Sequence, residues 1–89
     1  MHQRYLEITF RNGKPLAAYL YLPRNTGDKS VRTEQPEPGI IIDYAADDRA
    51  IGIEILNPSS TSAESINHIL TSIHQPPASI EELNPLVAA

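Results

Sequence analysis

Two carboxylates, Asp43 and Glu54, stand in neighbouring aliphatic runs of PGIIIDYAADDRAIGIEIL, the stretch from residue 38 to residue 56. Two carboxylates on one face of a sheet can chelate a hard cation, or can act as general acid and base if their pKa values are driven apart. No third ligand accompanies them, and His68 and His74 are six residues apart, a spacing that does not share a helical face. We therefore expect Asp43 and Glu54 to be polar strand positions, with no catalytic residues, metal or cofactor. A small metal-dependent or acid/base enzyme using this pair is the alternative.

A hairpin must position these carboxylates, because the aliphatic runs around them alternate with a period of two residues. A turn centred on Asp47-Asp48 would place six large side chains on one face: Ile40, Ile42, Tyr44, Ile51, Ile53 and Ile55. The same parity leaves Asp43 and Glu54 together on the other face, either directly opposite or diagonal to each other. A tight turn here needs a residue with positive φ, and we expect Asp47 or Asp48 to adopt it.

An earlier hairpin is predicted from the alternation over residues 4–10 and 16–22, on either side of RNGKP. A two-residue Asn12-Gly13 turn would mix the apolar and polar faces. We therefore expect a three-residue loop with Gly13 in the left-handed conformation, as in a type I turn with a G1 bulge. This register gathers the apolar side chains on one face: Leu6, Ile8, Phe10, Leu16, Ala18 and Leu20. The polar, proline-containing residues 23–38 indicate a loop with a short edge strand near residues 31–34.

After residue 56 the period changes to that of a helix. The apolar positions at i, i+3, i+4 and i+7 are Ile66, Ile69, Leu70 and Ile73. Thr61 and Glu64 fit a capping box, and the prolines at 76–77 should end the helix.

These elements predict an α+β fold: a small antiparallel sheet of four or five strands, arranged as two hairpins, with one α-helix packed on its aliphatic face. We expect residues 1–75 to form a single domain. Residues 76–89 are expected to form a proline-containing tail that docks on the sheet or on a neighbouring chain.

The opposite face of the sheet is the candidate interaction surface. It is expected to carry Tyr5, Tyr19, Tyr21, Ile41, Asp43 and Glu54. Tyrosine is favoured in interfaces because its ring is apolar and its hydroxyl polar, and an exposed patch of this kind is unusual for a monomer. We therefore predict a non-enzymatic interaction module that self-associates as a homodimer or binds a protein partner. The alternative is that the C-terminal tail or a loop covers the tyrosines within one chain.

Charge and composition restrict the partners and the compartment. The net charge is −4, and after residue 32 one arginine faces nine acidic residues, which favours basic partners and disfavours nucleic acid. The absence of cysteine excludes disulfides and thiolate metal sites. The N-terminus lacks the apolar core of a signal peptide, and no apolar run approaches the about 18 residues that span a bilayer. We expect a cytoplasmic protein that does not bind membranes.

The run GIIIDYAADDRAIGIEIL, followed by NPSS, resembles the small bacterial family catalogued as domain of unknown function 2283. The matching positions are Gly39, Asp43, Tyr44, Asp47, Arg49, Gly52, Ile53, Glu54, Ile55 and Leu56, and YLYL at 19–22 resembles the preceding strand. The chain departs from the family pattern at Phe10-Arg11 and Leu16, where carboxylates are common, and at Asp48, where glycine is usual. The resemblance implies a small α+β domain without established chemistry. Members that resemble this chain can lie beside toxin-like genes, so the resemblance also implies a partner-binding or antitoxin-like role.

Overall fold

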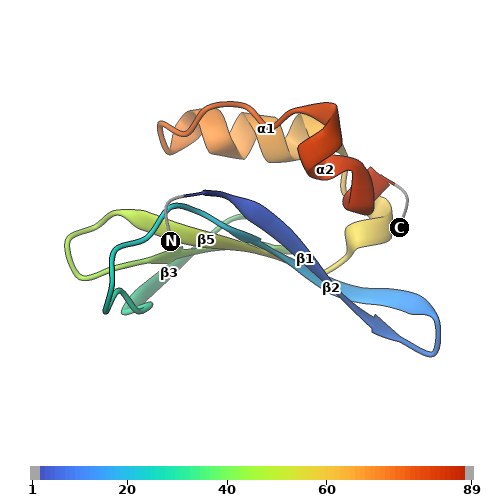
Figure 1. The fold of residues 1–89 in the computed structure, drawn as a ribbon, viewed down its shortest axis with the longest axis horizontal. Coiled ribbons are helices and arrows are strands. Elements are labelled where there is room, and N and C mark those ends of the chain that lie inside the picture. The colour runs from blue at the N-terminus through green and yellow to red at the C-terminus, as the bar shows by residue number, and fades with distance from the viewer. Residues whose placement is uncertain (1–2, 88–89) are drawn as a thin grey trace.

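Alternating apolar residues build five strands in the computed structural model, which describes residues 3–87 (Figure 1). The strands are β1 (Tyr5–Arg11), β2 (Lys14–Tyr21), β3 (Arg32–Glu37), β4 (Ile40–Tyr44) and β5 (Ala50–Ile55). They form one antiparallel sheet in the order β1-β2-β5-β4-β3, so β1 and β3 are its edges. A short 3-10 helix η1 (Pro58–Ser60) and the α-helices α1 (Ala63–Ser72) and α2 (Ile80–Val87) follow. The predicted α+β class is confirmed, with a second helix that the sequence analysis did not include.

The hydrophobic core lies between one face of the sheet and the two helices, which are both on that side (Figure 1). The sheet contributes Ala18, Leu20, Leu22, Ile40, Ile42, Tyr44, Ile53 and Ile55. The helices contribute Ile66, Ile69, Leu70, Leu83 and Leu86. Because burying one such aliphatic side chain is worth about 1.5–3 kcal/mol, this layer fixes the positions of β2, β4 and β5, and Leu6 and Ile8 of β1 pack against it partly buried.

The β4–β5 hairpin has the predicted parity. Ile40 pairs with Ile55 and Ile42 with Ile53, and all four side chains are buried. Asp48 has a φ of 68°, which confirms the predicted left-handed turn residue. A bulge between the pairs of Asp43 and Tyr44 leaves Ile51 unpaired in this register, and its side chain is also buried.

The β1–β2 hairpin has the predicted register, but the predicted loop is wrong. Leu6 pairs with Leu20 and Ile8 with Ala18, as expected. Asn12 and Gly13 form a two-residue turn with φ of 53° and 75°, the signature of a type I′ turn. The extra residue that parity requires is a bulge within the strands, because Thr9 pairs with Ala17 and Phe10 with Pro15.

The far end of this hairpin lies outside the core, which corrects a second expectation. Phe10 is 59% exposed and Leu16 is 50% exposed. The bulge changes the register at this point, and the hairpin projects beyond the helices (Figure 1). The apolar alternation that includes Phe10 and Leu16 therefore predicted the strands correctly, but the expected burial of these two side chains is wrong.

The predicted edge strand is present as β3, over Arg32–Glu37, and Val31 precedes it. It joins β4 through a tight turn in which Gly39 has a φ of 83°, so the sheet is a hairpin plus a three-stranded meander. Pro36 lies in a bulge between the pairs of Glu34 and Glu37, a position that tolerates a residue without an N–H group.

Both ends of α1 differ from the predicted capping. The N-cap is Ser62, whose hydroxyl accepts from the Ser65 N–H at 3.1 Å, whereas the Thr61 hydroxyl donates to the Asn57 carbonyl. The helix ends at residue 72, before the prolines, because His74 adopts a φ of 63° and Gln75 N–H closes on the Leu70 carbonyl.

Helix α2 is short and contains Pro85, so packing rather than helix propensity holds it in place. Leu83 and Leu86 are buried against the sheet. The Arg4 guanidinium bonds both carboxylate oxygens of Glu82, at 2.8 and 3.0 Å, and also the carbonyls of residues 76 and 77. Within residues 3–87, neither helix combines the length and the apolar character that crossing a bilayer requires.

Candidate functional site

Six predicted surface residues share the face of the sheet that points away from the helices. We call this the tyrosine face, formed by Tyr5, Tyr19, Tyr21, Ile41, Asp43 and Glu54. Tyr5 pairs with Tyr21, and Glu54 lies between Tyr19 on one neighbouring strand and Ile41 on the other. Because α1 and α2 pack on the other side (Figure 1), no helix among residues 3–87 covers this face, and the C-terminal helix does not shield the tyrosines.

The three tyrosines form a continuous aromatic row across β1 and β2. The rings of Tyr5 and Tyr21 are stacked, with centroids 4.4 Å apart and an interplanar angle of 18°. Tyr19 meets Tyr21 edge-on at 4.7 Å. Arg24 lies 5.3 Å from the Tyr21 ring centroid, and Tyr21 donates a hydrogen bond to Glu7 at 3.3 Å. These contacts fix the orientation of the rings.

Gly52 allows Tyr19 to cross the central strand β5. A Cβ atom at Gly52 would lie 1.8 Å from the Tyr19 hydroxyl oxygen and 2.3 Å from Cζ, the ring carbon that bears this hydroxyl. The ring therefore occupies the space of the missing side chain. Across β5, the Tyr19 hydroxyl donates to Oδ2 of Asp43 at 2.6 Å. The glycine and the aspartate of the family-like motif are therefore parts of one cross-strand contact.

Both carboxylate oxygens of Asp43 accept hydrogen bonds from side chains of the same chain. Its Oδ1 accepts a hydrogen bond from the Ser30 hydroxyl at 3.2 Å, and Arg24 donates to the Tyr19 oxygen at 3.1 Å. Burial, and next the bond to Asp43, raise the pKa of Tyr19 well above its ordinary value. The Tyr19 hydroxyl therefore remains a proton donor to the carboxylate.

Asp43 and Glu54 are diagonal neighbours, one of the two arrangements that the parity allowed. Asp43 faces Gly52, and Glu54 faces Ile41. Within residues 3–87, no three His, Asp or Glu side chains are grouped in a way that could hold a metal ion.

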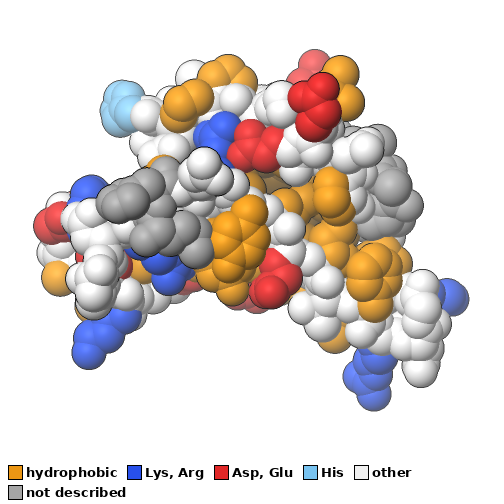
Figure 2. Space-filling view, in the orientation of Figure 1, with side chains coloured by type: hydrophobic (Ala, Val, Ile, Leu, Met, Phe, Trp, Pro, Cys, Tyr) orange, Lys and Arg blue, Asp and Glu red, His pale blue; other side chains and the backbone are white. Residues whose placement is uncertain are grey.

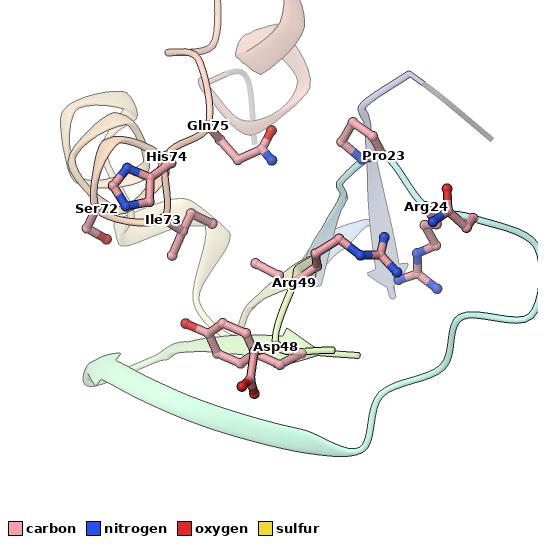
Figure 3. Close-up of a pocket in the computed structure, with 11 residues that line it drawn as sticks. Pro23, Arg24, Asp48, Arg49, Ser72, Ile73, His74 and Gln75 are labelled. Carbon is pink, nitrogen blue, oxygen red and sulfur yellow. The ribbon is translucent and has the colours of Figure 1, made fainter. Parts of the chain in front are cut away.

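A cleft of about 630 Å³ lies elsewhere, at the end of α1. Figure 3 shows Arg24 and Arg49 on one side of it and Ile73, His74 and Gln75 on the other. No sequence pattern predicts this cleft, because its walls come from the loop after β2, the β4–β5 turn and the end of α1, which are distant in sequence.

The cations of the cleft already have partners. Arg49 bonds Asp47 at 2.6 Å and Asp28 at 2.8 Å, and hydrogen bonds from Arg49 lower the pKa of both carboxyl groups. Arg24 donates to the Ile51 carbonyl at 2.9 Å. Arg49 is therefore already neutralised by two carboxylates, whereas Arg24 is held by uncharged acceptors, the Ile51 carbonyl and the Tyr19 hydroxyl.

The middle of the chain corresponds to a known family. Residues 17–59 match the family described as Protein of unknown function (DUF2283). The resemblance stated from the motif is confirmed over this segment. The DUF2283 segment runs from β2 to η1 and includes Tyr19, Asp43 and Gly52, while β1, α1 and α2 lie outside it. No curated protein and no solved structure gives a significant match to the chain.

Proposed function

We propose that the protein is a non-enzymatic interaction module that binds a protein partner on its tyrosine face. The observation that carries this proposal is the one-sided cover of the sheet: both helices pack on the aliphatic face, while Tyr5 on the opposite face is 42% exposed. Ordered aromatic rings that stay accessible are the usual anchors of protein interfaces, because they bury large areas at little cost in side-chain entropy.

The chemistry of this face favours a basic partner. Glu7 and Glu54 lie among the rings, so a lysine or arginine of a partner can meet a carboxylate and a tyrosine ring together. The net charge of −4 favours association with a basic protein over long range. The antitoxin-like role implied by the family resemblance, which is the sequestration of a basic toxin, is one case of such binding.

The engagement of Asp43 supports docking over catalysis on this face. Both oxygens of the carboxylate accept hydrogen bonds from side chains of the same chain, and Tyr19, its closest partner, is held protonated. A general acid or base needs reach to a substrate in a recess, whereas the 630 Å³ cleft lies at the end of α1.

The test is a comparative affinity capture from native cells with the full chain as bait. Tyr21→Ala removes the centre of the aromatic row, and Ile80→Ala is the matched control, because it removes an exposed aliphatic side chain from α2 on the other side of the molecule. We expect a protein that the native chain and the control retain and that Tyr21→Ala loses.

The captured protein is then purified and titrated directly. We expect Tyr21→Ala to weaken binding about tenfold or more, and added salt to weaken binding to the native chain. Equal affinities for the native chain and Tyr21→Ala would overturn the proposal, provided that circular dichroism shows both to be folded.

A further inference from the structure

The two edges of the sheet differ in their protection. Edge strands expose unpaired backbone groups, and proteins shield them with prolines, charges and bulges. β3 has all three, with Pro36, a bulge at that point and charged residues at three of its six positions. β1, with the sequence YLEITFR, is a longer strand without proline and has one charge inside it and one at its end. The β1–β2 pair also contains a bulge, but its extra residue, Leu16, lies on β2, so the β3 edge is the better protected of the two.

The outer edge of β1 is also open in this fold. β1 pairs with β2 on one side only, and helix α2 packs over its aliphatic face through Leu83 and Leu86. Among residues 3–87, no backbone hydrogen bond joins the strand to any segment other than β2. The outward N–H and C=O groups can therefore accept a further antiparallel strand.

The side chains of β1 complement themselves about Ile8, the central residue of the strand. In a two-fold antiparallel pair with Ile8 opposite Ile8, Leu6 faces Phe10 and Tyr5 faces Arg11. The first pair is apolar, and the second sets a cation beside an aromatic ring. A register centred on Glu7 would instead place two carboxylates opposite each other.

We propose that β1 pairs with β1 of a second copy of this chain, with Ile8 on the two-fold axis. The result is one continuous sheet with five strands from each copy. This dimer goes beyond the proposed function and does not require it.

The exposed end of the β1–β2 hairpin supports this pairing. Phe10 is 59% exposed, and Figure 2 shows apolar side chains on the surface of the hairpin that projects beyond the helices. In the proposed register each Phe10 meets Leu6 of the other copy, on the strand that α2 contacts. The hairpin end that adds nothing to the core of its own chain then packs against the core of its neighbour.

The pairing also extends the tyrosine face, because Tyr5, Tyr19 and Tyr21 of both copies come to the same side of one sheet. This consequence rests on the proposed function, whereas the dimer itself does not.

The absence of cysteine from the chain permits a direct test of the register. Residues opposite each other in an antiparallel pair have Cα atoms about 4.5–5.5 Å apart, within the range of a disulfide. In Ile8→Cys chains, oxidation should therefore produce a covalent dimer. Thr33→Cys is the matched control, since Thr33 lies on the opposite edge strand, and it should remain monomeric under denaturing electrophoresis.

Sedimentation equilibrium of the unmodified chain should show a species of twice the chain mass. Phe10→Ser should weaken this dimer about tenfold or more without unfolding the monomer, because the ring is outside the core. Tyr21→Ala should leave the dimer intact, which separates this proposal from partner binding on the tyrosine face. A monomer at all concentrations, cross-linking of Thr33→Cys as strong as that of Ile8→Cys, or cross-linking of Glu7→Cys to itself would each overturn the inference.

Discussion

The contact between Tyr19 and Gly52 gives the sharpest prediction about stability. The backbone of Gly52 lies outside the left-handed region, so alanine fits its conformation and would ordinarily gain about 0.5–1 kcal/mol in a strand. In this protein the new Cβ atom would occupy the position of the Tyr19 hydroxyl. Because the obstacle is the far end of a side chain, the ring would swing away and the strands would stay in place.

The cost of Gly52→Ala is therefore the loss of the contacts that Tyr19 makes. The hydrogen bond to the Asp43 carboxylate is worth about 1.5–3 kcal/mol in general, and we take about 1 kcal/mol for this half-exposed position. The edge-on contact with Tyr21 adds about 0.5–1.5 kcal/mol. After the alanine gain is subtracted, we expect Gly52→Ala to lower the free energy of unfolding by about 0.5–2 kcal/mol.

A double-mutant cycle with Tyr19→Ala isolates this effect. Once the ring is gone, Gly52→Ala should be neutral or stabilising by about 0.5–1 kcal/mol, so the two substitutions should be coupled by about 2 kcal/mol. Urea denaturation followed by far-ultraviolet circular dichroism measures all four free energies. An equal loss from Gly52→Ala in both backgrounds would refute the reasoning, since the cost would then have another origin.

Three further predictions concern the turn, the core and the tyrosines. Asp48→Gly should raise the free energy of unfolding by about 0.5–1 kcal/mol, because glycine adopts the positive φ without strain and the exposed ion pair with Arg32 contributes little; loss of stability in urea denaturation would contradict this. Ile69→Ala should cost about 2–5 kcal/mol in the same assay and His68→Ala far less, because Ile69 is buried and His68 is exposed. The raised pKa of Tyr19 means that the native state holds this proton more tightly than the unfolded state, whose tyrosines titrate near pH 10. The stabilisation that comes from the protonated Tyr19 hydroxyl should be complete below about pH 10 and should decrease as the pH rises further. In an absorbance titration, an Asp43→Asn variant should form tyrosinate at a lower pH than the native protein.

The registers within the two hairpins were largely predictable because side-chain parity admits few solutions. In β4 and β5 the alternation of the isoleucines allowed two registers, and the structure has the one that pairs Ile40 with Ile55, whereas in β1 and β2 the alternation predicted the pairing of Leu6 with Leu20. Side-chain parity depends on the number of residues between two paired positions, and it does not show whether an extra residue lies in the loop or in a bulge within a strand. A bulge at the Phe10–Pro15 pair and a three-residue loop satisfy the same count, so the predicted position of the extra residue is wrong.

Features made by distant segments were beyond reach of the sequence. Arg4, which is 78 residues from Glu82, helps to hold α2 in place, and this contact has no sequence signal. The helix itself has a local signal despite Pro85, because the Ser79 hydroxyl caps it by accepting from the Glu82 N–H, and the buried Leu83 and Leu86 lie three residues apart. The engagement of Asp43 depends on a tyrosine 24 residues earlier that crosses a glycine on the strand between them. The cross-strand partners of Tyr19 could have been anticipated only by aligning β2 with β5, for which the hairpin patterns give no register.

The pairing of β2 with β5 has a consequence for how the chain folds. The β1–β2 hairpin and the β3-β4-β5 meander each form from neighbours in sequence, whereas the partners across β2 and β5 are 31 to 37 residues apart. The core needs the aliphatic faces of both units. The β2–β5 pair must therefore form before the core is complete, and its formation carries the entropic cost of closing the loop between the two strands. Tyr19, on β2, crosses this pair: its ring lies over Gly52 of β5, and its hydroxyl donates to Asp43 of β4. The DUF2283 segment thus contains both strands of the β2–β5 pair, which joins partners far apart in sequence, and the side chain that crosses it.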